Sequence, residues 1–454
     1  MTSGSIWKSL LFFALPIMFG SLLQQLYNTV DGIVVGNYVS QNALAAVGGV
    51  ASVTFLLLCI SNGMSGGASV IVAQYYGAGK MDEMRRAVST IFIMLGGLGV
   101  FFTVFGFFIA PAMVHGILRV EDAEIAEMSI LYFKVYACGL LIQYIYNAIA
   151  GILRALGDSK STLYFLCIAA VMNIILDLLF VLKFSWGVFG VAFATVLSQL
   201  FCMAFSVFYM LKKYPMFRFK KGEFIFDREI FRITLRLGIP ATIQQAIISL
   251  GNVLLQRLVN GFGAITMTAF AVGHRVESYC MLPMFAFNTA VSVFAGQNMG
   301  AGKVSRAKKG LGSTILLSVI SSGVMGVLLY IFAKPFCTLF GVEGAALSQA
   351  VEMVRFMAVV ITIFAAYFPC SGFLQGSGDA LVASVASFTT LGVRVLTAYS
   401  CVFFFSVGYK SAWVTMPVGW ICAAAVAYSR FFRGKWQKKA LVKYDEDQTE
   451  KIAE

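Results

Sequence analysis

Charged side chains are scarce in this sequence. Asp, Glu, Lys and Arg make up 12% of its 454 residues, about half the share that soluble proteins carry. Histidine occurs only twice, and the nine cysteines stand singly, several of them inside apolar runs. Such cysteines behave as small buried hydrophobic residues, and neither residue type has the spacing of a metal site. The composition therefore argues against a soluble protein and against a metal centre built from histidine or cysteine.

Long loops are also missing: no connection between apolar runs exceeds about twenty residues, which leaves no room for a domain outside the membrane. The one glycine-rich element that ends in lysine, "GAGK", lacks the spacing and the following Ser or Thr of a phosphate-binding loop. We find no constellation of nucleophile, base and orienting group, so we do not expect an enzyme.

What the sequence has instead is twelve long apolar runs. The chain is 59% hydrophobic with a mean hydropathy of +0.84, and a bilayer-spanning helix needs about 20 mostly apolar residues. The runs cover residues 11–35, 45–76, 87–114, 129–150, 161–183, 187–211, 232–259, 267–298, 311–333, 350–374, 380–405 and 411–432. The sequence predicts an all-α polytopic protein of the cell membrane with twelve transmembrane helices.

Basic residues recur at every second connection between these runs, whereas the connections 36–44 and 260–266 have none. The positive-inside rule then predicts that both termini are cytoplasmic, which agrees with an even number of helices. The net charge of +13 follows from the same rule. We therefore expect the lipid bilayer, and no nucleic acid, as the partner of the basic residues.

The sequence contains an internal repeat. "QYYGAGK" at 74–80 returns as "QNMGAGK" at 297–303, and "GILRALGDS" at 151–159 returns as "GFLQGSGDA" at 372–380. Landmarks in the same order at a nearly constant offset predict two pseudo-symmetric six-helix lobes of equal orientation. We assign "GAGK" to a structural turn between the second and third helices of each half. The predicted parts are an N-terminal lobe 1–211, a basic cytoplasmic linker 212–231, a C-terminal lobe 232–433 and a charged cytoplasmic tail 434–454.

Two acids lie inside the apolar runs of the first half without a basic residue at comparable depth. Asp31 shares a helix face with Gln24 and Tyr27, and Asp177 shares one with Asn173. Ionisable residues within membrane spans are functional hypotheses by default. Two acids without a base must be protonated or share a cation, and oxygen donors of this kind suit Na⁺. The alternative is that each acid only hydrogen-bonds a neighbouring helix.

These features resemble the multidrug and toxic compound extrusion (MATE) family. The resemblance rests on "LP" fifteen residues before the Asp of "VDGIVVG", on "GILRALGD" after the fourth run, on the Asn-x-x-x-Asp pair and on a Thr eighteen residues later. It covers nearly the whole chain. It implies a cation or proton site in the first lobe, made by Asp31, Asn173, Asp177 and Thr195, with Na⁺ possible at the two acids.

The same resemblance implies a polar substrate pocket beside that site. Tyr27 matches a pocket residue of the family, and we also assign Gln24 and Asn147 to the pocket. The second half departs from the first, because uncharged residues stand where counterparts of the two acids would lie. We expect Glu277 to pair with Arg394 and hold the second lobe together; the alternative is a role for Glu277 in substrate or proton binding.

The predicted function is secondary active multidrug efflux by alternating access. Drug-like organic compounds, often cationic, would leave in exchange for inward H⁺ or Na⁺, without a further cofactor and with the protein as a monomer. Pro16 lacks an N–H group, so the first helix can bend there and reshape the cavity; the alternative is a static kink. A lipid-linked oligosaccharide flippase of the same superfamily is the alternative function, and it would need a cationic cavity. A channel would need a symmetric pore ring, which the diverging repeats do not supply.

Overall fold

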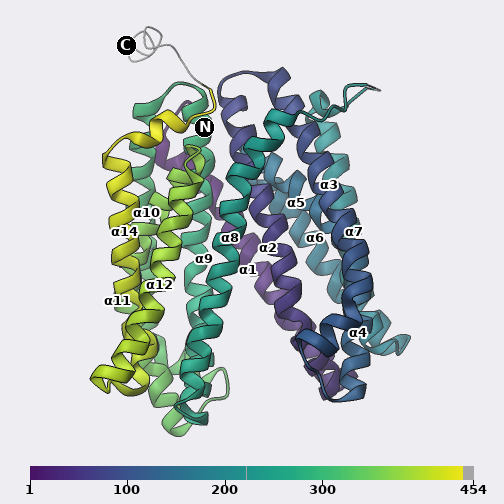
Figure 1. Cartoon of the computed structure of the whole chain (residues 1–454), viewed down its shortest axis with the longest axis vertical. Helices are drawn as coiled ribbons and strands as arrows, with labels where there is room; N and C mark the ends of the chain where they lie inside the picture. The colour runs from purple at the N-terminus through teal and green to yellow at the C-terminus, as the bar shows by residue number, and fades with distance from the viewer. Residues whose placement is uncertain (221, 443–454) are drawn as a thin grey trace. The chain divides into compact units, whose positions relative to one another are not determined.

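The computed structural model of the chain describes residues 1–220 and 222–442, and the regular structure within them is helical with no strand. The helices of the first half are α1 (Ile6–Val34), α2 (Gln41–Gly77), α3 (Met81–Ala112), α4 (Ala123–Cys138), α5 (Leu140–Ala155), α6 (Ser159–Leu178) and α7 (Gly187–Lys213). Those of the second half are α8 (Arg228–Asn260), α9 (Ala264–Gly300), α10 (Val304–Thr338), α11 (Gly344–Gly376), α12 (Ala380–Phe405), α13 (Ser411–Val414) and α14 (Met416–Phe432) (Figure 1).

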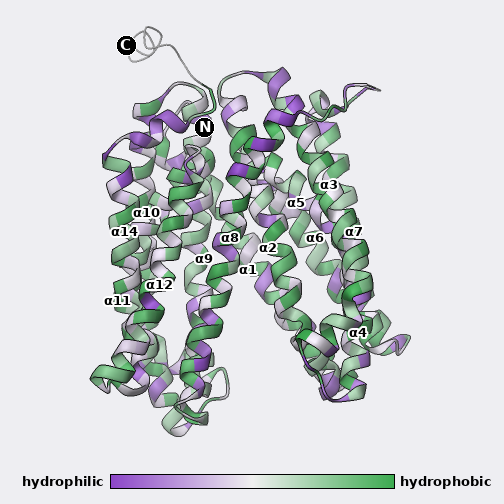
Figure 2. Ribbon diagram, viewed as in Figure 1, coloured by the Kyte–Doolittle hydropathy of each residue, from purple (hydrophilic) through white to green (hydrophobic). Residues whose placement is uncertain are grey.

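The helices are long and apolar enough to confirm the predicted polytopic fold. Eleven helical segments of the described chain could each cross a bilayer, and the pair α4 and α5, bent by 46° at Gly139, makes a twelfth when taken as one span. Hydrophobic residues follow the lengths of the helices, and hydrophilic residues gather toward their ends (Figure 2). The bend falls at a glycine because α7 approaches closely there: a Cβ on Gly139 would press against Val196.

Contacts divide the chain into two compact units whose boundaries differ from those of the predicted lobes. Unit 1 contains Met1–Met18, Ala73–Gly79 and the chain from Ile243 onward, and unit 2 contains Phe19–Val72 and Lys80–Thr242. The first helix of each half is therefore shared, because α1 passes from unit 1 to unit 2 after Met18 and α8 passes from unit 2 to unit 1 after Thr242. The lobes 1–211 and 232–433 remain a prediction about the repeat.

Apolar packing explains why the beginning of α1 belongs to unit 1. Leu10, Phe13 and Ala14 are buried in one cluster with residues of α9, among them Phe287 and Phe294. The beginning of α8 packs equally closely within unit 2, where Gly67 and Gly238 approach so closely that a Cβ on either would overlap the other helix. Small residues at helix crossings let backbones come together in this way.

The repeated "GAGK" element forms the predicted turn in both halves. Gly79 and Gly302 lie between consecutive helices with φ of 72° and 73°, the left-handed conformation that glycine adopts at low cost. The glycines two positions earlier have another role. A Cβ on Gly77 at the end of α2 would overlap the carbonyl oxygen of Gln297 in α9, and a Cβ on Gly300 would overlap that of Gln74 in α2. The two copies of the repeat therefore contact each other reciprocally within unit 1.

The predicted linker and tail are both partly folded. α7 extends to Lys213 and α8 begins at Arg228, so the connection is shorter than 212–231, and residue 221 lies outside the described residues. Arg85 of α3 binds Glu223 at 2.8 Å and holds the connection against unit 2. In the predicted tail, Trp436 is fully buried. The rest of the tail, 443–454, lies outside the described residues.

The repeated "GD" motif ties helix ends together in each half. Asp158 accepts hydrogen bonds from Lys213 at 2.8 Å and from Tyr209 at 2.9 Å, both at the end of α7. Its counterpart Asp379 accepts one from Arg430 of α14 at 2.6 Å. Burial alone would raise the pKa of Asp158, but the hydrogen bonds from Lys213 and Tyr209 outweigh it and hold that pKa below its usual value.

We expect Asp158→Asn to lower the free energy of unfolding at neutral pH by about 1–2 kcal/mol, because the part-buried Tyr209 and the half-exposed Lys213 lose a charged acceptor. A carboxyl whose pKa is lowered by folding stabilises the protein above its unfolded pKa, about 4, and that contribution disappears as the pH falls through the folded value. The difference between wild type and variant in thermal midpoint should thus shrink below about pH 4. An equal difference at pH 7 and at the acid limit would contradict the role of the charge.

Candidate functional site

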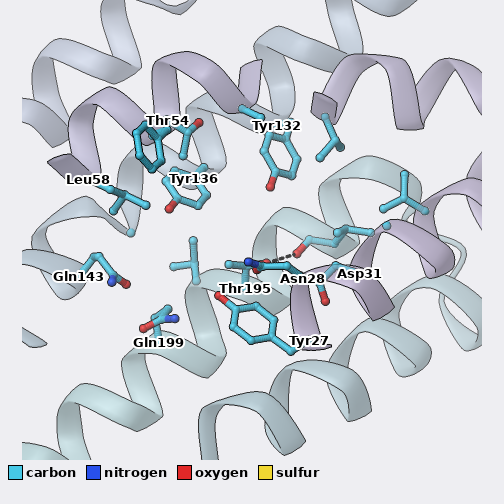
Figure 3. Close-up of a pocket in the computed structure, with 18 of the residues that line it drawn as sticks. Tyr27, Asn28, Asp31, Thr54, Leu58, Tyr132, Tyr136, Gln143, Thr195 and Gln199 are labelled. Atoms are coloured by element: carbon cyan, nitrogen blue, oxygen red, sulfur yellow. Dashed lines mark hydrogen bonds between the residues drawn. The ribbon is translucent and has the colours of Figure 1, made fainter. Parts of the chain in front are cut away.

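A cavity of about 370 Å³ lies within unit 2, between α1, α2, α4, α5 and α7. Gln24, Tyr27 and Asp31 reach it from one face of α1, as their spacing of three and four residues predicts. Thr195 reaches it from α7. Asp31 is the one charged side chain among the described residues that line the cavity. The remaining lining is aromatic, amide and aliphatic (Figure 3).

Asp177 lies beside Asp31, behind the cavity wall, on α6. The two carboxyl groups are close enough to interact electrostatically. Asp177 and Asn173 are buried, at 0% and 2% exposure, and with both acids ionised neither oxygen of Asp177 nor the amide of Asn173 has a partner among the described residues. The carboxyl groups of Asp177 and Asp31 lie within hydrogen-bonding reach of each other, but a bond between them requires a proton on one of them. Oδ1 of Asp31 is likewise without a partner. The structure thus brings the two acids and the amide predicted from sequence into one cluster.

Unpaired buried polar atoms are rare and need an explanation such as a missing proton, ion or water. This cluster has five, and no ion pair to Asp31 or Asp177 occurs in the described chain. A proton shared by the carboxyls, or a cation held by their oxygens, would satisfy these atoms. Thr195 donates its hydroxyl hydrogen to Val191 of its own helix at 3.1 Å, which leaves its lone pairs to face the cavity. Among the described residues, no group of three His, Cys, Asp or Glu side chains could hold a transition metal.

Sequence reasoning missed the wall opposite α1. Tyr132 and Tyr136 of α4 point into the cavity across from Tyr27 (Figure 3), and their rings stack with centroids 6.2 Å apart. Gln143 and Gln199 complete the polar lining. Part of the signal was available, because Tyr132 and Tyr136 are four residues apart on one helix and Gln199 follows Thr195 by four on another.

Asn147 does not join the cavity, although we assigned it to the substrate pocket. It is buried between α2 and α5, where its side-chain amide donates to Ser61 at 2.9 Å and its backbone carbonyl oxygen accepts from Ser65 at 2.6 Å. These bonds explain the residue as a connection between helices. Pro16 lies inside α1 as predicted, and its role as a bend stays a prediction.

In the second half, Glu277 has a different partner from the expected one. His274 Nδ1 lies 3.0 Å from Glu277 Oε2, and no ion pair joins Glu277 to Arg394 among the described residues. The two partners are one turn apart on α9, so they face each other without any help from tertiary packing. The sequence argument considered only strong bases and overlooked this neighbour.

Comparison with known proteins gives the same family from both halves of the chain. The family model described as MatE matches residues 16–179 and again residues 240–400. The two matches together span more than half of the chain, and each begins at the proline of the first helix of its half. This agrees with the internal repeat.

Two curated relatives match over nearly their whole length. The chain is 28% identical to the probable multidrug resistance protein YoeA of Bacillus subtilis, covering 97% of this chain and 96% of that protein. It is 26% identical to the probable multidrug resistance protein NorM of Thermotoga maritima, covering 96% and 94%. A solved outward-facing structure of a multidrug resistance MATE family transporter of the MOP superfamily has the same fold, with a TM-score of 0.89 over 96% of this chain and 97% of that one at 24% identity.

Proposed function

Because the chain belongs to the MatE family and is a multi-pass protein of the cell membrane, we propose that it exports drug-like organic compounds in exchange for inward H⁺ or Na⁺. The observation that carries the proposal is the cluster of Asp31, Asp177 and Asn173, buried without a base and with five unpaired polar atoms. Coupling by an ion needs a group that changes its charge or its ligand during the cycle. This cluster supplies that group at the edge of a cavity.

The coupling mechanism follows from linkage. The ion and the exported compound need not touch, because each has only to bind one conformation better than the other. Two deprotonated carboxylates at Asp31 and Asp177 would repel each other in a low-dielectric setting. A proton or Na⁺ removes that repulsion and favours a repacked α1. Pro16 supports such a movement, because it leaves the carbonyl of Phe12 without its helical donor.

The cavity suits a compound with an aromatic or cationic body. Its volume of about 370 Å³ falls within the usual range for small-molecule pockets. Tyr27, Tyr132 and Tyr136 offer ring faces, which attract cations as well as aromatic groups. Amide side chains such as Gln143 can donate or accept hydrogen bonds, so the lining favours varied ligands. The same lining disfavours the flippase alternative, since a pyrophosphate group would meet Asp31 and no base among the described lining residues.

The experiment that tests the proposal is efflux from proteoliposomes of defined orientation. We expect a fluorescent organic cation to move under an imposed pH gradient, under an imposed Na⁺ gradient, or under both, and to stop moving when the gradient is collapsed by an ionophore. The two gradients applied separately identify the coupling ion. Movement at the same rate without either gradient would contradict the proposal of an antiporter.

A further inference from the structure

An arginine lies inside the second half without a hydrogen-bond partner. Arg394 of α12 is only 9% exposed, and its Nε is fully buried and unpaired. None of the described residues accepts a hydrogen bond from its guanidinium group. A buried guanidinium nitrogen without an acceptor is costly, because folding has removed its water without supplying a hydrogen-bond partner. Such a group needs a partner that the chain itself does not provide.

Glu277, the acid that interacts electrostatically with Arg394, already has a hydrogen-bond partner. Glu277 interacts with Arg394 through space, but its Oε2 is held by His274 at 3.0 Å. When His274 is protonated, the three side chains together carry one net positive charge. When His274 is neutral, Glu277 and Arg394 together carry no net charge, but the two groups are too far apart to form an ion pair. The guanidinium therefore keeps its donors available in either state.

The neighbourhood of Arg394 is polar on one side of α12. Ser387 and Thr390 precede it by seven and four residues, which places the three on one helix face. Gln244 of α8 donates to the Ser387 hydroxyl. The buried Tyr367 hydroxyl of α11 lies close to Ser387 and Thr390. These side chains belong to the described part of unit 1, and two of them share a helix face with Arg394.

The internal repeat relates Arg394 to a residue of the candidate site in the first half. An offset of 221 residues, the offset of the repeated "GD" motif, relates Arg394 to Asn173, which belongs to the acidic cluster of the first half. Asp177 is related by the same offset to Ala398. At equivalent points of the repeat, the first half thus carries two acids without a base, and the second half carries a base without a bound acid.

We propose that Arg394 is the centre of an anion-binding site in the second half, which takes the carboxylate or phosphate group of an exported compound. The planar fork of a guanidinium matches such a group with two parallel hydrogen bonds. Ser387 and Thr390 donate their hydroxyl hydrogens to Ala383 and Ala386 of their own helix, so the hydrogen bonds to the anion come from the guanidinium itself. The inference rests on the proposed export function and names the residue that would hold the acidic group of such a substrate.

The test compares a fluoroquinolone, which carries both an amine and a carboxylate, with its methyl ester, which keeps the amine and loses the carboxylate. Binding is measured with the full-length protein in phosphatidylcholine nanodiscs, so that no lipid headgroup with a net negative charge competes for the site. We expect wild type to bind the acid more tightly than the ester. Arg394→Gln should weaken binding of the acid about tenfold, the value of one charge-assisted contact, and leave the ester unchanged.

Two further variants separate this proposal from a purely structural role of Arg394. Glu277→Gln removes the nearby negative charge and should increase the preference for the acid, which a structural ion pair would not do. Arg394→Lys should retain part of that preference. The control is Arg275→Gln, an exposed arginine of α9 that packs over Phe340 and should change neither affinity.

Equal affinities of wild type for acid and ester would overturn the inference while leaving the proposed function standing. An unchanged preference in a folded Arg394→Gln protein would also overturn it. If Arg394→Gln does not fold, the Glu277→Gln variant decides. A weaker preference for the acid over the ester in that variant would overturn the inference. Binding of neither compound would count against the inference and the proposed function together, and export of an organic cation under an ion gradient then decides the proposed function separately.

Discussion

Asp31→Asn is expected to reduce gradient-driven efflux at least about tenfold while the protein remains as stable as wild type. Asparagine keeps the shape of the side chain but cannot gain or lose a proton at neutral pH, so the charge change that couples ion and substrate is lost. Stability should not fall, because Asp31 has no ion pair to lose in the described chain and Oδ1 has no hydrogen-bond partner. Removing an uncompensated charge from a membrane interior is favourable or neutral.

The measurement pairs efflux from proteoliposomes with thermal unfolding of the same preparations. Asp177→Asn should behave in the same way, since its two oxygens are also without partners. Asp158→Asn provides the matched control, because this acid is bonded by Lys213 and Tyr209 and should lose stability instead. Wild-type efflux by Asp31→Asn would remove it from the coupling mechanism. A large fall in its thermal midpoint would mean that it has a structural partner.

The helices and the acidic cluster could be predicted because their signals are local. A run of about 20 apolar residues predicts a span wherever its neighbours lie, and the comparisons confirm the family and the polytopic fold. The spacing of Gln24, Tyr27 and Asp31 placed them on one face because helix periodicity alone decides it. The proximity of Asp177 to Asp31 was an inference from the lack of a base, and the structure brings the two together.

The features that were missed depend on contacts between distant segments or on a weaker base. Asn147 looked like a pocket residue because it is polar within an apolar helix, yet its side-chain amide donates a hydrogen bond to Ser61 of α2. Glu277 was paired with Arg394 by depth in the membrane, although His274 lies one turn away. The division of α1 and α8 between the two units could not be predicted, because it depends on which distant segments each part of these helices contacts.

The "GAGK" element shows how one motif can contain two different physical reasons for glycine. The sequence led us to assign both glycines of each copy to the end of a helix. The positive φ of Gly79 and Gly302 agrees with that interpretation. Gly77 and Gly300 are helical, however, and are required by the close approach of α2 to α9. Only the structure distinguishes the two, because a sequence does not reveal which backbone lies opposite a helix end.

Gly77→Ala is therefore expected to destabilise the protein and to abolish efflux. The added methyl group would overlap the carbonyl oxygen of Gln297, which is backbone and cannot rotate away as a flexible side chain would. The helices must separate, at a cost of about 3 kcal/mol for an overpacked contact. Separation would also disturb Gln74, which donates to the carbonyl of Gly376 at 3.1 Å and accepts from the backbone of Leu441 at 2.7 Å. Gly300→Ala, which meets the carbonyl of Gln74, should have the same effect.

Gly48→Ala is the matched control for this prediction. It lies in the same helix, α2, and nothing approaches within 4 Å of a Cβ built there. Alanine forms helix better than glycine by about 1 kcal/mol, so Gly48→Ala should leave the thermal midpoint unchanged or raise it slightly. The opposite signs of the two Gly→Ala changes separate backbone packing from helix propensity. Thermal unfolding and efflux of the three variants measure this directly, and a Gly77→Ala protein that matches Gly48→Ala in both would show that the close approach of α2 and α9 is not needed for the transport cycle.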